Sequence, residues 1–183
     1  MTEPDLETDL FDFDRYLERV GLSRDELGQF APQSHALLHL LMWAQATRIP
    51  WENLSNVDPV RRRVLHPSSE AGVHEAEHDV PAKLRTSIAP NDVYHKLVER
   101  RRGGYCYEHN LLLARALRDV GFAVALVAAR GVNRGVISDA ELGFPLNAST
   151  HLVLVATTAD GARFLVDDGF VWAGAPRTPL RLA

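Results

Sequence analysis

Two apolar runs joined by an Asp-Gly pair constrain the fold of this chain more than any other feature. The runs THLVLVATT (150–158) and ARFLVDDGF (162–170) have the length and apolar character of buried strands. Asp-Gly between such runs is a strong hairpin signal. A hairpin centred there places residues 151–153 opposite residues 167–169. Because a third apolar run, FAVALVAARGV (122–132), comes before the pair, we expect a mainly antiparallel sheet or barrel-like part.

The residues before this sheet have the pattern of helices. Ser23 and Glu26 have the spacing of a capping box, and the residues from 55 to 90 carry four prolines without sustained periodicity. We interpret residues 55–90 as a long loop insertion. The expected α+β fold has a helical bundle domain over residues 1–121 and an antiparallel β domain over residues 122–183. Helical patterns begin near Phe13, Ser23, Ser34, Asn91 and Cys106.

Composition excludes several classes of partner and location. The net charge is −4, and the basic run Arg61–Arg63 is short and lacks interleaved aromatic residues, so we expect no nucleic-acid binding. No apolar run approaches the roughly 20 residues of a membrane span, and the acidic N-terminus lacks a secretory signal. One cysteine cannot form an internal disulfide, which fits a reducing compartment. We therefore expect a soluble cytoplasmic protein.

Cys106, the only cysteine, stands in the stretch RRGGYCYEHN at the predicted first turn of a helix. The unpaired N–H groups and dipole of a helix start favour an anion, which would lower the thiol pKa from about 8.5. Gly103 and Gly104 permit a sharp turn and a close approach of substrate, and backbone N–H groups there could stabilise an oxyanion. The alternative is a buried cysteine that only fills space.

A nucleophilic cysteine requires a base, and the base requires an orienting group. His151 begins a predicted strand, and the hairpin brings a carboxylate from Asp167 or Asp168 within cross-strand reach of it. Since successive strand residues face opposite sides, only one of the two carboxylates can share the face of His151. The residues alone leave open which one does.

Other motifs suggest different chemistry. His74-Glu75-Ala76-Glu77-His78 matches the H-E-x-x-H pattern of zinc proteases, but its flanking prolines and lack of apolar neighbours favour a chance match in a polar loop. His35 and His39 are four residues apart on an apolar helix face, where packed histidines are the usual finding. We expect no metal site, and we expect Met42 and Trp43 in the core. Trp51 either packs or lines a pocket.

Four segments of the chain resemble arylamine N-acetyltransferases. RRGGYCYEHN is similar to the family pattern R-G-G-x-C-x-E, and IPWENL (49–54) is similar to I-P-F-E-N-L with Trp51 in place of Phe. THLVLV (150–155) resembles the histidine strand of the family, and LVDDGF (165–170) resembles V-D-V-G-F-G. The segments occur in the family's order, and the resemblance covers nearly the whole chain.

The resemblance implies roles for particular residues. Cys106 would be the nucleophile, His151 the base and Asp167 the orienting acid, in a core like that of cysteine proteases. Arg102 and Glu52 would form a buried charged pair that supports the site together with Gly103, Gly104 and Glu108.

The implied activity is transfer of acetyl from acetyl-CoA to an arylamine, arylhydrazine or N-hydroxyarylamine, as in xenobiotic metabolism. The reaction would be ping-pong through an acetyl-cysteine, with acetyl-CoA as a substrate and no permanently bound cofactor. The chain also departs from the family. Asp168 and Val171 replace the usual Val and Gly, and the third domain of the family is expected to be absent. The alternative function is therefore that of an impaired family member that acts as a binding module, with an exposed apolar surface that favours homo-oligomers.

Overall fold

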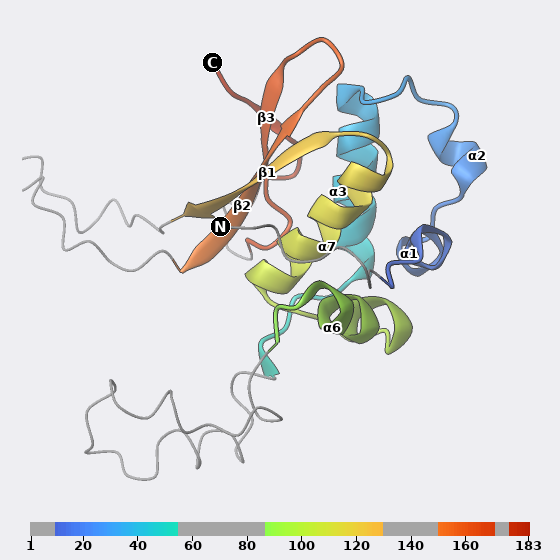
Figure 1. Ribbon diagram of the computed structural model, residues 1–183, viewed down its shortest axis with the longest axis vertical. Coiled ribbons are helices and arrows are strands. Elements are labelled where there is room, and N and C mark those ends of the chain that lie inside the picture. The colour runs from blue at the N-terminus through green and yellow to red at the C-terminus, as the bar shows by residue number, and fades with distance from the viewer. Residues whose placement is uncertain (1–9, 55–86, 130–149, 171–175) are drawn as a thin grey trace, which may run out of the picture.

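The structure is a computed structural model that describes residues 10–54, 87–129, 150–170 and 176–183. Helices pack against one antiparallel sheet, so the predicted α+β class is confirmed (Figure 1). No helix in these ranges is both long and apolar enough to span a membrane. The helices are α1 (Phe13–Val20), α2 (Arg24–Leu27), α3 (His35–Arg48), α6 (Pro90–Tyr94), the π-helix η4 (His95–Glu99) and α7 (Cys106–Asp119), and the strands are β1 (Ala123–Ala129), β2 (His151–Thr157), β3 (Arg163–Val166) and β4 (Leu180–Arg181).

Local sequence signals explain where the first helices begin and end. The Asp12 carboxylate accepts from two N–H groups at the start of α1, and Gly21 ends this helix in the left-handed conformation with φ 72°. The capping box of Ser23 and Glu26 is present at α2, and the Ser34 hydroxyl caps α3. The predicted capping box of Ser23 and Glu26 and the predicted helix starts near Phe13 and Ser34 are therefore confirmed, because caps depend only on neighbouring residues.

The predicted loop of residues 55–90 lies mostly outside the described residues. Its last residue, Pro90, begins α6, where proline is favoured because the first helical N–H has no partner inside the helix. The division into domains at residue 121 stays a prediction. One cluster of buried side chains draws on the helices as well as on β2 and β3.

Helix α7 is central in the fold, because it contacts β1 and β2 as well as α1, α3 and α6 (Figure 1). Its apolar face is buried, with Leu113 and Leu117 fully covered. Burial of such side chains stabilises a fold by about 1.5–3 kcal/mol each. This packing positions Cys106, the first residue of α7, between the helices and the sheet.

The described strands form an open antiparallel sheet in the order β1-β2-β3-β4. The barrel-like closure considered for this part is therefore not seen among them. The predicted hairpin is β2 and β3, with Leu154 opposite Val166 and Thr157 opposite Arg163. Its connection is longer than the two-residue Asp-Gly turn, because residues 158–162 lie between the last paired residues and Gly161 has φ 81°.

Gly103 and Gly104 are required for space rather than for a special backbone angle. Neither residue has a positive φ. A Cβ atom on Gly103 would lie 2.3 Å from the Pro50 carbonyl oxygen. Glu52 N–H donates to the Gly104 oxygen at 2.8 Å, and Gly104 N–H donates to the Pro50 oxygen at 3.2 Å. The close approach that Gly103 permits is therefore to the chain's own backbone, where the sequence suggested a substrate.

We predict that Gly103→Ala lowers the free energy of unfolding by about 1–3 kcal/mol, because a backbone oxygen must shift to admit the methyl group. Gly28→Ala is the control, since the atoms nearest to its added Cβ lie at 3.4 Å and its backbone is helical. Urea unfolding of both variants measures the difference. Equal losses would contradict the packing argument.

Candidate active site

Cys106 lies where the start of α7 meets the end of β3. Its side chain is partly buried, and the thiol donates a long hydrogen bond, 3.9 Å, to the Thr150 carbonyl oxygen just before His151. Gly169 packs so closely here that a Cβ on it would lie 2.8 Å from Cys106 Cβ. The segment that follows Asp167 and Asp168 is thus pressed against the cysteine.

The thiol of Cys106 differs from the sequence expectation in its acidity. Burial raises the pKa of the Cys106 thiol, and the backbone N–H groups of Tyr107 and Leu152 act in the opposite direction. The negative charge of Asp167 raises the pKa further. The predicted effect of the helix start is present but smaller than that of burial, so the prediction of a lowered pKa is wrong. A base is therefore needed to remove the proton.

His151 and Asp167 are joined by a hydrogen bond at the mouth of the hairpin. Nε2 of His151 lies 2.7 Å from Oδ2 of Asp167, and their side chains are 15% and 8% exposed. An imidazole that donates from Nε2 to a carboxylate keeps Nδ1 free to accept a proton. The structure therefore joins His151 to Asp167 and places the Cys106 thiol against Thr150, the residue before His151.

Asn110 was missed by the sequence reasoning, although it connects the helix to both strands. Its Nδ2 donates to the Leu152 carbonyl oxygen at 2.6 Å and to Asp167 Oδ1 at 3.1 Å. Its Oδ1 accepts from the Asp168 N–H at 3.1 Å, and the side chain is fully buried. Its place four residues after Cys106, on the same face of a helix, was the available signal.

Asp168 faces away from His151, toward the helices. Its Oδ2 lies 3.2 Å from Nδ1 of His109 and also accepts from Nε2 of Gln45. The two adjacent carboxylates thus point to opposite sides, as expected from the sequence, although β3 ends at Val166, just before them. The structure pairs Asp167 with His151 and Asp168 with His109.

The charged residues near the site are arranged differently from the expectation. Arg102 Nη2 lies 3.3 Å from Glu52 Oε1, but the Arg102 side chain is 53% exposed, so the predicted burial of this pair is wrong. The buried pair is Lys96 with Glu108: Nζ lies 2.8 Å from Oε1, and the Glu108 side chain is 1% exposed. Glu108 also accepts from the Tyr105 N–H at 3.0 Å and so caps the start of α7.

We predict that Lys96→Met lowers the free energy of unfolding by about 3–5 kcal/mol, because it leaves Glu108 buried without its cation. Arg102→Met removes the same kind of charge from an exposed pair and should cost less than about 1 kcal/mol. Thermal unfolding of the two variants at one pH makes the comparison. A larger loss for Arg102→Met would reverse the assignment of the buried pair.

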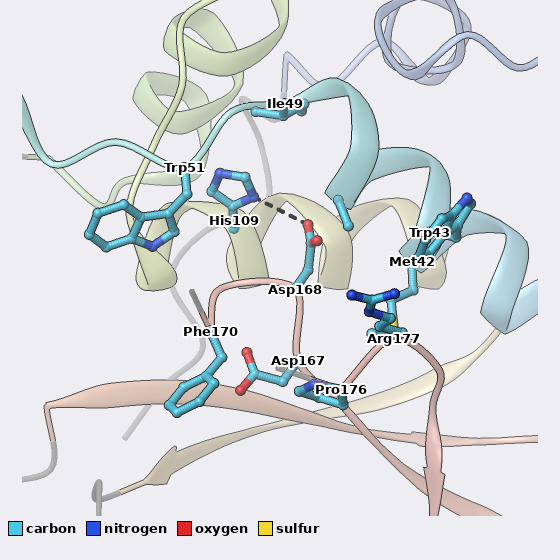
Figure 2. Close-up of a pocket in the computed structure, with 11 residues that line it drawn as sticks. Met42, Trp43, Ile49, Trp51, His109, Asp167, Asp168, Phe170, Pro176 and Arg177 are labelled. Carbon is cyan, nitrogen blue, oxygen red and sulfur yellow. Dashed lines mark hydrogen bonds and ion pairs between the residues drawn. The ribbon is translucent and has the colours of Figure 1, made fainter. Parts of the chain in front are cut away.

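A cavity of about 220 Å³ lies beside the Asp167–Gly169 segment, and Trp43, Trp51 and Phe170 line part of it (Figure 2). The Trp51 indole N–H donates to the Gly169 oxygen at 3.1 Å, so this side chain both packs and lines the cavity. Met42 is buried as predicted, whereas Trp43 is 46% exposed and does not belong to the core. The next position along a helix points about 100° away, which turns Trp43 out of the buried face.

The histidines of α3 make contacts of their own. The His35 ring stacks on Phe164 at 4.7 Å, and His39 Nε2 lies 3.2 Å from the Arg177 oxygen. Within the described ranges no group of three or more His, Cys, Asp or Glu side chains could hold a metal ion. The H-E-x-x-H segment at 74–78 lies outside those ranges.

A family model described as "N-acetyltransferase" matches residues 77–183. An arylamine N-acetyltransferase of Mycolicibacterium smegmatis is 37% identical over 163 residues, which are 87% of this chain and 46% of that protein. One from Mycobacterium tuberculosis is 43% identical over 96 residues, 52% of this chain and 32% of that protein. This chain therefore spans about half or less of the length of these relatives.

Solved structures have the same fold. The M. smegmatis arylamine N-acetyltransferase matches with a TM-score of 0.65 and 34% identity, over 94% of this chain and 51% of that one. The Mycobacterium marinum enzyme in complex with CoA matches with a TM-score of 0.63 and 31% identity, over the same shares of the two chains. The similarity extends over both the helices and the sheet.

Proposed function

The chain belongs to the N-acetyltransferase family, and on that premise we propose that it transfers acetyl from acetyl-CoA to an arylamine, arylhydrazine or N-hydroxyarylamine. One observation supports the proposal most. His151 is hydrogen-bonded to Asp167, and the residue before His151 accepts a hydrogen bond from the thiol of Cys106, the only cysteine of the chain. A thiol, a base and an orienting acid are the groups that acyl transfer through a thioester requires.

In this proposal His151 moves the protons. Its Nδ1 takes the proton of the Cys106 thiol while sulfur attacks the carbonyl carbon of acetyl-CoA, and the CoA sulfur leaves with that proton. The amine then attacks the acetyl-cysteine, His151 accepts a proton from nitrogen, and the Cys106 sulfur is released and protonated. Asp167 holds the Nε2–H throughout and stabilises the imidazolium that forms between the two transfers.

The oxyanion of each tetrahedral intermediate needs N–H donors. Gly104 N–H donates to Pro50 and Tyr105 N–H donates to Glu108, so these two are already used. The N–H groups of Cys106, Tyr107 and Leu152 lie near the sulfur, and the first two belong to the first turn of α7. We assign the oxyanion to this turn.

The arrangement supports a core like that of cysteine proteases, with the nucleophile at a helix start and the base on a strand of the sheet. The related arylamine N-acetyltransferases have chains about twice as long as this one. We therefore propose that this shorter chain still binds both acetyl-CoA and the acceptor. The cytoplasmic location, the role in xenobiotic metabolism and self-association stay predictions.

The first test is whether acetyl-CoA forms an acetyl adduct with the protein. Incubation with acetyl-CoA should add one acetyl group to the protein by intact mass, and Cys106→Ser should add none under the same conditions. An arylamine should then remove the adduct and appear as its amide. A stable adduct that no amine removes is the result expected of a binding module. No adduct at all contradicts the proposed enzyme.

The second test is the pH dependence of thiol reactivity. Burial raises the pKa of Cys106, so without its base the residue stays a protonated thiol at neutral pH. We predict that His151→Ala reaches half of its maximal iodoacetamide rate at a higher pH than the native protein, because only the native protein has an imidazole beside the thiol that can take its proton. With acetyl-CoA, the rate of His151→Ala should fall about 10²–10⁴-fold. Superimposable alkylation profiles would show that His151 does not act on Cys106.

A further inference from the structure

His109 and Asp168 form a second histidine–carboxylate pair, which the proposed reaction does not use. Figure 2 shows the two side chains pointing toward one another between α7 and the end of β3, joined by the contact of 3.2 Å between Nδ1 and Oδ2. The His109 side chain is 2% exposed and that of Asp168 is fully buried. A buried carboxylate requires compensation, so this pair needs an explanation.

The hydrogen bonds of His109 determine how many protons the pair holds. Nε2 lies 3.3 Å from the Pro50 carbonyl oxygen, which can only accept, so Nε2 carries a hydrogen. The contact between Nδ1 and Asp168 Oδ2 also needs one hydrogen, on either atom. An imidazolium with a carboxylate and an imidazole with a carboxylic acid both satisfy these bonds. In either form the pair has no net charge.

Neighbouring polar groups surround the proton that His109 and Asp168 share. Gln45 Nε2 donates to Asp168 Oδ2 and to the His109 carbonyl oxygen at 2.9 Å, and Gln45 Oε1 accepts from the Tyr16 hydroxyl at 3.1 Å. Oδ1 of Asp168 is buried without a hydrogen-bond partner in the described part of the chain. Burial raises the pKa of Asp168, and its hydrogen bond to His109 opposes the change.

Within the described residues, ionisable groups near the pair come from several elements, and Arg177 lines the same cavity as His109 and Asp168 (Figure 2). Tyr16 of α1 approaches through Gln45, and burial followed by the charge of Asp168 raises the Tyr16 pKa. Asp167 is the adjacent residue, and Cys106 is one helical turn before His109. A net negative charge on the pair would oppose ionisation of both Asp167 and the Cys106 thiol. A neutral pair avoids this repulsion.

We infer that the His109–Asp168 pair positions the Asp167–Gly169 segment against the start of α7, and thereby orients Asp167 toward His151. The segment is held from two sides. Asn110 binds Asp167 Oδ1 and the Asp168 N–H on one side, and His109 with Gln45 holds the Asp168 side chain on the other. His109 and Asp168 are positioning residues, since they act through Asp167, and this role rests on the proposed function of the site.

The test uses Asp168→Val, His109→Leu and the double variant. Each single change leaves a buried polar partner without its bond and should destabilise the protein. The double change replaces the pair with apolar side chains and should recover much of the melting temperature, because such replacements are often neutral. If the pair positions Asp167, the double variant will still alkylate at Cys106 about 10- to 100-fold more slowly at pH 7.

Two further variants complete the experiment. Asp168→Asn keeps the size of the side chain but loses the shared proton, and the atom that replaces Oδ2 cannot both donate to His109 Nδ1 and accept from Gln45 Nε2, so one of these two bonds is lost. Alkylation should slow about 2- to 10-fold, the equivalent of one hydrogen bond, and one downfield imidazole N–H resonance should disappear. His95→Leu is the control, because His95 pairs with Glu99 at an exposed site and should leave the rate unchanged.

The outcomes separate a positioning role from simple packing. A folded double variant with the native alkylation profile and native His151 titration would overturn the inference. So would a native rate in Asp168→Asn, whatever the double variant does. Because alkylation needs no acetyl-CoA, slower alkylation in a protein that forms no acetyl adduct would support positioning and reject only the proposed acetyl transfer.

Discussion

The buried amide of Asn110 is the interaction on which the rest of the site depends. One side chain on α7 binds the backbone of β2 at Leu152, the carboxylate of Asp167 and the backbone of Asp168. Helix and hairpin are therefore held in a single relative position. A donor or acceptor left without a partner in such a place costs about 1–3 kcal/mol, which strongly favours this one arrangement. Cys106 and Asp167 derive their relative position from it.

Close packing and charge hold the start of α7 from the other side. The absence of a side chain at Gly103 lets the 50–52 segment bond to Gly104, and Lys96 neutralises the buried Glu108 that caps the helix. The cysteine thus begins a helix whose first turn is fixed from two directions. The same burial raises the pKa of the Cys106 thiol. A thiol with a raised pKa stays protonated, so the proposed reaction needs a neighbouring base.

Much of the fold could be predicted from short-range patterns. The caps of α1 to α3, the helix start at Cys106 and the β2–β3 hairpin depend on neighbouring residues or on one turn, and the structure contains them. The buried cation was not predictable in this way. Lys96 reaches Glu108 from a π-helix twelve residues earlier, while Arg102, adjacent to the glycines, stays exposed. The exposure of Trp43 was not predictable either, because a hydrophobic residue in a helix is buried only if another element covers it.

The sequence by itself determined the chemical groups and their local geometry: one cysteine at a helix start, a histidine at the beginning of a strand and two adjacent carboxylates on the strand that pairs with it. Strand alternation also predicted that the carboxylates face opposite sides. Only the tertiary structure decided which side each one faces. Asp167 turns to His151, and Asp168 turns to His109 and Gln45, because the buried amides of Asn110 and Gln45 come from helices far away in the chain. No local pattern encodes such contacts, since they exist only once α3, α7 and the hairpin have packed together.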